Sequence, residues 1–286
     1  MNAPSVRAFF HEPTNSVSYL VWDAASRRAA IIDGVLDFDP KSGYTGTHSA
    51  EAIVAAVRAE ALSVAWILET HVHADHLSAA PFLKQSTGAP VVIGEHVRTV
   101  QATFKDIYNL ADLTPDGRPF DRLVADGATL PLGEFQIKVL HTPGHTPACV
   151  SYSIGDAVFV GDTMFMPDYG TARADFPGGD ARTLYRSIQK LLALPDATRV
   201  FLCHDYMAPG RDSFAWETTI GAQRTTNVHL KGVREDDFVA MREARDKTLS
   251  APALILPSIQ VNIRAGELPA PESNGVRYLK LPLNKL

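Results

Sequence analysis

A stretch of seven residues holds the densest set of metal-binding side chains in this chain. From Thr70 to His76 it reads T-H-V-H-A-D-H, which places three histidines and one aspartate close together. Without a cation, these imidazoles and this carboxylate would desolvate and repel one another, so a purely structural role would be costly. Imidazole and carboxylate groups are common metal ligands. The stretch therefore predicts a metal site that uses His71, His73, Asp75 and His76.

Three further candidate ligands come later in the chain. Each follows a predicted strand: His145 after residues 135–140, Asp162 after residues 157–160, and His204 after residues 199–202. Taken singly, each is a weak signal, because an aspartate that follows a glycine at a strand end is usually a turn former. Their shared position after strands strengthens them, since loops at strand ends commonly carry functional side chains.

The elements around the first cluster would hold it in place. The apolar run 64–68 predicts a buried strand that ends just before the cluster. Helical spacing over residues 77–85 predicts a helix directly after it, with Gly88 and Pro90 as stop signals. The cluster is therefore expected in a tight loop between a strand and a helix, where rigid flanking elements keep converging side chains still.

Strands followed by helices are predicted in both halves of the chain. The expected strands are 17–22 and 29–32, which form a hairpin, then 91–93, 150–154 and 157–160. The expected helices are 49–62 with Ser49 as N-cap, 96–110, and 181–194 with Asp180 as N-cap. Residues 112–120, rich in proline and glycine, predict a surface excursion. This pattern predicts an α/β fold in which two sheets pack together with helices outside.

Composition restricts the class of protein. The chain has 286 residues, of which 45% are hydrophobic and 21% charged, with a formal net charge of -5, as expected for a soluble globular protein with a sizeable core. No apolar stretch approaches the roughly 20 residues that span a bilayer, and the first residues lack a leader pattern, so we expect a cytoplasmic protein without a membrane partner. The acidic balance argues against nucleic acid as a partner. Cys149 and Cys203 are expected to be free buried thiols.

The order of these motifs resembles the metallo-β-lactamase superfamily over roughly residues 15–206. The matching motifs are H-x-H-x-D-H, then P-G-H, then G-D, then a histidine after a late strand. The resemblance implies an αββα sandwich. It also implies two metal positions, one surrounded by His71, His73, His145 and Asp162, and one by Asp75, His76, Asp162 and His204.

Narrower motifs resemble the persulfide dioxygenase family. They are R-A-D-F from Arg173, H-D-Y from His204 and N-I-R-A-G from Asn262. The resemblance to that family implies that His71, His145 and Asp162 hold a single Fe(II). The remaining residues, His73, Asp75, His76 and His204, would surround it as hydrogen-bonding groups or form a vacant second metal site. The implied reaction is oxidation of glutathione persulfide with O2 to sulfite and glutathione, a step of hydrogen sulfide detoxification.

Three side chains are candidate substrate contacts. Arginine grips carboxylates through two parallel hydrogen bonds, so Arg173 is a candidate for a glutathione carboxylate, with a salt bridge to Asp175 as the open alternative. Tyr206 is expected to hydrogen-bond the substrate. Arg224 is a further candidate, with an ordinary surface position as its alternative.

The ligand residues also permit a different reaction. A dizinc hydrolase of glyoxalase II or lactonase type would use water between two zinc ions to attack a thioester or lactone carbonyl, with Asp162 shared by both ions. The segments R-x-D-F and H-D-Y favour the dioxygenase. A metal-binding regulator without catalysis is a third hypothesis, and it predicts a closed site with no open coordination position.

The same resemblance suggests how the chain is organised. Residues 1–210 are expected to form the catalytic domain, and residues 211–286 a C-terminal extension packed on the same domain. The stretch 104–120 departs from shorter family members and marks a longer, bacterial-type branch. A homodimer is the assembly that several relatives suggest.

Overall fold

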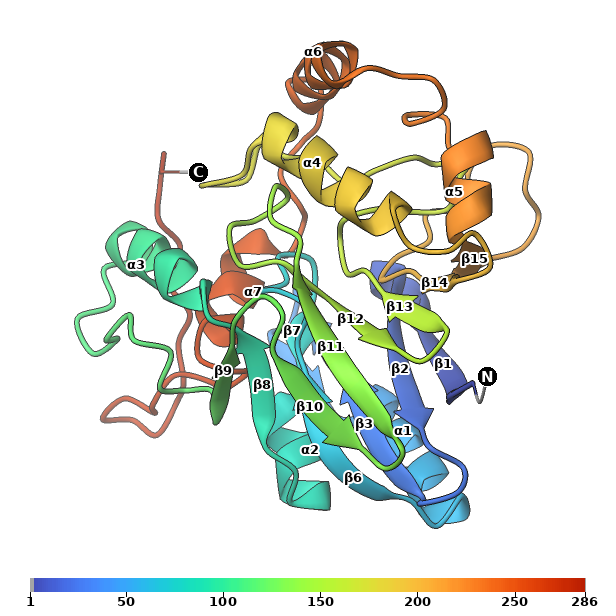
Figure 1. Ribbon diagram of the computed structural model, residues 1–286. Coiled ribbons are helices and arrows are strands. Elements are labelled where there is room, and N and C mark those ends of the chain that lie inside the picture. Colours follow the sequence, from blue (N-terminus) through green and yellow to red (C-terminus); the bar gives the residue numbers. More distant parts are fainter. Residues whose placement is uncertain (1–2, 286) are drawn as a thin grey trace.

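Two six-stranded β-sheets form the centre of the computed structural model, which describes residues 3–285 (Figure 1). The first sheet has the order β1 (Ser5–His11), β2 (Ser16–Trp22), β3 (Arg28–Ile32), β6 (Ser63–Leu68), β8 (Val91–Gly94) and β9 (Arg122–Val124). The second has the order β10 (Thr129–Leu132), β11 (Phe135–His141), β12 (Val150–Ile154), β13 (Ala157–Phe159), β14 (Arg199–Phe201) and β15 (Glu217–Thr219). A small third sheet joins β5 (Tyr44–Gly46), β4 (Val35–Asp39) and β7 (Leu77–Ser78).

Alternating side chains along the strands separate three hydrophobic layers. In β2, Tyr19 and Val21 point into the layer between the two sheets, where they meet residues such as Val139 and Phe159 of the second sheet. Leu20, between them in sequence, belongs to the layer on the other face. Because successive strand side chains point to opposite faces, one strand supplies both layers.

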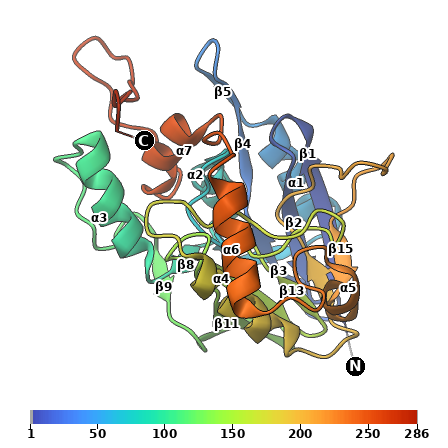
Figure 2. The ribbon, with the colours of Figure 1, turned by 90° about the horizontal axis from the view of Figure 1, so that it is seen from above.

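Helices cover the outer face of each sheet. Against the first sheet pack α1 (His48–Ala59), α2 (Ala80–Thr87), α3 (Val97–Tyr108) and α7 (Ile255–Asn262). Against the second pack α4 (Ala181–Leu192), α5 (Ile220–Thr226) and α6 (Glu235–Asp246). Figure 2 shows α6 crossing above α4, with which it is in contact. The predicted αββα sandwich is confirmed by this layering.

Several local predictions are confirmed by the structure. The hairpin of β2 and β3 pairs antiparallel, and Asp180 caps α4 by accepting a hydrogen bond from the backbone N–H of Thr183. Cys149 and Cys203 are both free and buried. Within residues 3–285, no helix combines the length and the apolar character needed to cross a membrane.

Other local predictions are wrong, because tertiary contacts override the local pattern. Ser49 is not an N-cap: α1 begins at His48, and the Ser49 hydroxyl and N–H both donate to Asp37. The predicted helix at 77–85 begins only at Ala80, because Leu77–Ser78 pair with β4 as a short strand.

The segment 112–120 is less superficial than we expected. Leu113 and Phe120 are buried in the same layer as Phe104 of α3. The backbone N–H of Gly117 donates to the side chain of Gln101, 2.9 Å away. Apolar anchors therefore hold the segment against α3.

The sheet topology brings the candidate ligands to one edge. Strands β11, β13 and β14 run in the same direction, so their carboxyl ends, which precede His145, Asp162 and His204, lie at the same edge of the second sheet. Two backbone contacts join the first sheet to that edge, an isolated bridge between Ser16 and His204 and a hydrogen bond from Val150 N–H to the Thr70 carbonyl.

Candidate metal centre

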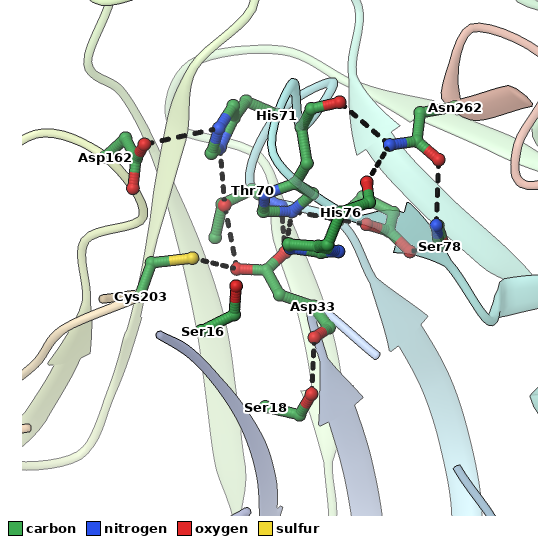
Figure 3. A network of polar contacts seen from close by, with 12 residues as sticks. Ser16, Ser18, Asp33, Thr70, His71, His76, Ser78, Asp162, Cys203 and Asn262 are labelled. Carbon is green, nitrogen blue, oxygen red and sulfur yellow. Dashed lines mark hydrogen bonds and ion pairs between the residues drawn. The ribbon is translucent and has the colours of Figure 1, made fainter. Parts of the chain in front are cut away.

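Asp162 lies at the centre of the cluster formed at this edge. Its Oδ2 is 3.6 Å from His145 Nε2 and 3.9 Å from His71 Nε2. Its Oδ1 is 3.3 Å from His204 Nε2, which is also 3.3 Å from Asp75 Oδ2. Residues from four separate loops thus place imidazole and carboxylate groups around one small volume. Figure 3 shows two of them, His71 and Asp162, facing each other.

Four of the histidines share one orientation. Each makes a hydrogen bond through Nδ1 and leaves Nε2 for the centre of the cluster: His71 with Thr70 Oγ1, His76 with the Leu77 carbonyl, His145 with the Arg173 carbonyl, and His204 with the Asn15 carbonyl. A carbonyl only accepts hydrogen bonds, so Nδ1 carries the proton of His76, His145 and His204 whenever the ring is neutral, and Nε2 then holds the lone pair. This is the tautomer that binds a metal through Nε2.

A chain of hydrogen bonds fixes the same tautomer for His71. Asp33 accepts from the backbone N–H of Thr70 at 2.7 Å and from its hydroxyl at 2.8 Å. Because that hydroxyl has a single proton, its oxygen must accept from His71 Nδ1, 3.0 Å away. Gly161 allows the close approach, since a Cβ there would lie 2.6 Å from Thr70 Oγ1.

Buried atoms without partners show that these residues fit a cation. His71 Nε2, His76 Nε2, His204 Nε2 and Asp162 Oδ1 are buried and have no hydrogen-bond partner among the described residues. Burial, followed by the neighbouring histidines, holds the pKa of His71 well below its usual value, and burial lowers the pKa of His76 to about 3. Neutral imidazoles are the metal-binding form, so one bound cation would satisfy several otherwise unpaired lone pairs.

His73 is arranged differently from the other histidines. Its Nε2 lies 3.1 Å from Asp33 Oδ1 and 3.5 Å from Glu69 Oε2, all three residues being buried. Burial alone would lower the pKa of His73, but Asp33 outweighs it and raises that pKa well above its usual value. The structure therefore places His73 in an ion pair beneath the cluster.

Sets of three candidate ligands, with ligand atoms within 4.8 Å of one another, recur in this region. They are His71, His145 and Asp162; His73, Asp75 and His76; His73, Cys203 and His204; and Asp33, Glu69 and His73. The first set consists of two imidazoles and one carboxylate, and it does not include His73. That set is the arrangement of non-haem Fe(II) oxygenases, which leaves coordination positions open.

A cavity of about 360 Å³ opens onto this set, and both His145 and Asp162 line it. Its walls come from distant parts of the chain: residues 13–15, the loop 162–176, Tyr206, and the C-terminal residues 242–254. Aromatic side chains, among them Phe165 and Phe176, form much of the wall. An apolar pocket that ends in a few convergent polar groups is typical of a small-molecule site.

The predicted substrate contacts differ in their placement. Arg173 lines the cavity, but its guanidinium forms the alternative salt bridge, with two hydrogen bonds to Asp175 of 2.6 and 2.7 Å. Tyr206 also lines the cavity and stacks on His204. Burial, then the carboxylates of Asp75 and Asp162, raises the pKa of Tyr206 well above its usual value, so its phenol remains a hydrogen-bond donor at neutral pH.

The structure does not bring Arg224 to the cavity. Its guanidinium binds the carboxylate of Asp196 and the backbone carbonyl of Leu192, on the outer side near α4. An exposed arginine pairs with the nearest acceptors that its reach allows, and here these lie outside the cavity walls. The prediction that Arg224 contacts the substrate is therefore wrong for this cavity.

Sequence reasoning missed three residues of this region. Asp33 holds the Thr70 side chain, Asn262 contacts the ligand loop, and Arg245 lines the cavity. Asp33, in the turn that follows the predicted hairpin, carries only a weak signal in the sequence. Asn262 begins the N-I-R-A-G motif, but the motif does not indicate what its side chain contacts, and nothing local marks Arg245, because the contacts of both are with residues far away in the sequence.

Comparison with known proteins identifies related chains. Residues 11–204 match the model of the metallo-beta-lactamase superfamily. The chain is 55% identical over 294 residues to a probable metallo-hydrolase of Burkholderia pseudomallei, covering 99% of this chain and 100% of that protein. It is 49% identical over 289 residues to glyoxylase B2 of Dictyostelium discoideum, covering 100% and 99%. It is also 56% identical to a beta-lactamase hydrolase-like protein of Xylella fastidiosa, of which it spans 66%.

A more distant relative is named as a persulfide dioxygenase. The human mitochondrial persulfide dioxygenase ETHE1 is 26% identical over 264 residues, covering 91% of this chain and 88% of that protein. Among solved structures, ETHE1 from Myxococcus xanthus superimposes with a TM-score of 0.74 at 29% identity, covering 92% of this chain and 100% of that chain. The fold thus agrees with that of the Myxococcus xanthus structure.

Proposed function

This chain belongs to the metallo-beta-lactamase superfamily, and from that premise we propose that it is a persulfide dioxygenase with one iron held by His71, His145 and Asp162. In this reaction the terminal sulfur of glutathione persulfide is oxidised to sulfite, O2 is reduced, water supplies the remaining oxygen atom, and glutathione leaves. When bound, the iron would supply the electron transfer between the sulfur and O2. The likeness to the ETHE1 structure supports the proposal.

The observation that carries the proposal is the convergence of His71, His145 and Asp162, whose ligand atoms lie within 4.8 Å of one another. His145 and Asp162 line the cavity, as does Asp75, which contacts His204 and the hydroxyl of Ser16, 3.3 Å from each. A second metal would have to break these contacts and would also meet His73 in its ion pair with Asp33. One metal at the first position leaves them intact.

The protein's own residues would orient the substrate. Tyr206 can donate its phenolic proton to a substrate acceptor near His204. Phe165, Tyr169 and Phe176 give the cavity an apolar wall that limits the access of water. His145 keeps Nε2 directed at the site because its Nδ1–H donates to the Arg173 carbonyl, 2.8 Å away.

A dizinc hydrolase is the second candidate. Two observations favour it: the Nε2 atoms of His76 and His204 are also without partners, and the relatives with about half of their residues identical carry the names metallo-hydrolase and glyoxylase. In that reaction, zinc-activated water would attack a thioester carbonyl. The two candidates differ in whether Asp75 is needed.

Substitution of Asp75 separates the two candidates. In the dioxygenase, Asp75→Ala should retain one iron per chain and lower O2 uptake by about 10–100-fold, the usual effect of removing an outer contact of a metal site. In a dizinc enzyme the same change removes a ligand and should abolish thioester hydrolysis. Metal content by elemental analysis and both activities would be measured, with Asp75→Asn as the control that keeps the shape. Loss of all iron from both variants would contradict the single-metal account.

Arg245 is the substrate contact that we propose in place of Arg224. It lines the cavity, and no acceptor lies within bonding distance of its guanidinium among residues 3–285, whereas Arg173 and Arg242 are paired with Asp175 and Asp246. Burial, followed by the charges of Arg242 and Arg245, lowers the pKa of His229 to about 4, so the charge of Arg245 is felt at this side of the cavity. That charge suits a carboxylate of glutathione.

Arg245→Ala should raise the KM for glutathione persulfide about fivefold, or about 1 kcal/mol, and leave kcat unchanged, because an exposed ion pair contributes uniform binding of that size. Arg234→Ala, an exposed arginine at the start of the same helix that pairs with Asp237, is the control. A persulfide of cysteamine, which has no carboxylate, should be insensitive to both changes. Equal KM values for the Arg245→Ala variant and the parent protein would remove Arg245 from the site.

A further inference from the structure

The side-chain amide of Asn262 contacts the ligand loop at three backbone groups. Asn262 lies at the end of α7 and is 4% exposed. Its Nδ2 donates to the carbonyls of His73 at 2.8 Å and His76 at 2.7 Å, and its Oδ1 accepts from the N–H of Ser78 at 2.8 Å (Figure 3). Backbone carbonyls only accept and an N–H only donates, so the orientation of this amide is fixed by its partners.

The loop needs such a partner because it has no regular structure of its own. Residues 69–76 lie outside any helix or strand, yet almost all of them are buried. A buried carbonyl without a hydrogen bond costs about 1–3 kcal/mol, so the loop would otherwise favour conformations that turn these groups to solvent. Four of the candidate metal ligands, His71, His73, Asp75 and His76, are on this loop.

Helix α7 is itself firmly anchored. Ile255, Ile259 and Ile263 are buried in the outer layer of the first sheet, and the Ile263 carbonyl accepts from Gln101 Nε2 at 2.9 Å. The turn after the helix also approaches the loop closely: a Cβ at Gly266, where φ is +85°, would lie 2.7 Å from the Ser78 carbonyl. A rigid helix can hold an irregular loop in one position.

We infer that Asn262 is a positioning residue for the metal site and that α7 completes this site from outside the superfamily match at residues 11–204. It acts through the backbone of the loop, which it fixes between His73 and Ser78, and so it sets the direction of the Nε2 atom of His76 and the carboxylate of Asp75. This role goes beyond the proposed reaction, because it holds for iron and zinc alike.

Helix α7 offers a matched control for the test. Gln260 is also a buried amide with three hydrogen bonds, to the carbonyls of Leu256 and Lys280 and from the Lys280 N–H, but it holds the C-terminal tail rather than the loop. Asn262→Asp and Gln260→Glu each remove two donors, keep the acceptor and preserve the side-chain shape. A defect that appears in the Asn262→Asp variant but not in the Gln260→Glu variant is therefore due to the loop, and not to the general loss of a buried amide.

Affinity for Fe(II) alone, measured anaerobically by competition with a chelator, gives the readout without any assay of activity. We expect Asn262→Asp to bind iron about 10–100-fold more weakly, with faster hydrogen exchange in residues 71–78. Gln260→Glu should bind iron as the parent protein does, even if both variants unfold at a lower temperature. Equal affinity in the Asn262→Asp variant and the parent, or an equal loss in both variants, would overturn the inference.

Gly266→Ala keeps the test decisive if the Asn262→Asp protein does not fold. The added Cβ would lie 2.6 Å from Pro81 Cδ and 2.7 Å from the Ser78 carbonyl, so it presses on the end of the loop without changing the Asn262 side chain. Weaker iron binding in this variant, together with normal binding in the Gln260→Glu variant, supports the coupling between α7 and the loop. Normal iron binding in a folded Gly266→Ala protein would count against it.

Discussion

Asp162→Ala should yield a folded protein that holds no metal and has lost its activity by at least about a thousandfold, as expected when the group that binds the catalytic metal is removed. Asp162 is the single carboxylate of the set with His71 and His145, and its second oxygen faces His204. Its removal therefore affects both candidate metal positions at once. Neither the dioxygenase nor the hydrolase would function without it.

Elemental analysis and the activity assay would be run together on this variant. Asp196→Ala is the control, since Asp196 is an exposed aspartate that pairs with Arg224 away from the cavity. The control should keep its metal and its activity. A parent-like metal content in the Asp162→Ala protein would refute the ligand set of His71, His145 and Asp162.

Asp33→Ala should lower the free energy of unfolding of the metal-free protein by about 3–5 kcal/mol, the usual effect of removing one partner of a buried charge pair. The change leaves the His73 side chain beside Glu69 alone and removes the acceptor of both the Thr70 N–H and the Thr70 hydroxyl. With Thr70 released, its hydroxyl can donate to His71, so metal affinity should fall as well.

The stability that is lost in the Asp33→Ala variant should be larger at pH 7 than at pH 3. Burial raises the pKa of Asp33, but His73 and the Thr70 hydrogen bonds outweigh burial, so the pKa is lowered in the folded protein. A lowered pKa stabilises the fold above the unfolded value of about 3.9, and this contribution is lost as the pH falls through the folded value. Urea unfolding at pH 7 and at pH 3 would measure it.

Asp39→Ala is the control for the Asp33 experiment. Asp39 is an exposed aspartate that caps a turn by accepting from Lys41 and Ser42, and its removal should cost only about 1 kcal/mol. If Asp33→Ala costs no more than this control at pH 7, the network of Asp33, Thr70 and His73 does not stabilise the fold as described.

Local signals in the sequence were sufficient for the central strands of both sheets, for α1, α3 and α4, and for the candidate ligands that follow strands. Asp180 was predicted as an N-cap because a cap depends on its own helix, whose Thr183 N–H it accepts at 2.7 Å. His145, Asp162 and His204 were found because each follows a strand, and parallel strands bring their ends to one edge. These inferences needed only neighbours in sequence and a plausible topology.

Residues whose partners are distant could not be found in this way. Ser49 has the sequence of an N-cap, but it bonds Asp37 in the neighbouring sheet. Asn262 contacts residues more than 180 positions earlier in the chain, and Arg245 is recognisable only from the cavity that it lines. A segment such as R-A-D-F gives no indication whether Arg173 binds Asp175 or a ligand, because both acceptors are carboxylates.

Uptake of O2 by the anaerobically iron-loaded protein on addition of glutathione persulfide tests the central claim most directly, with the zinc-loaded protein as its control. We expect rapid uptake with formation of sulfite in the iron sample only, which fits one iron at His71, His145 and Asp162. Absence of uptake, together with thioester hydrolysis by the zinc sample, would contradict the account and place Asp75, His76 and His204 among the metal ligands.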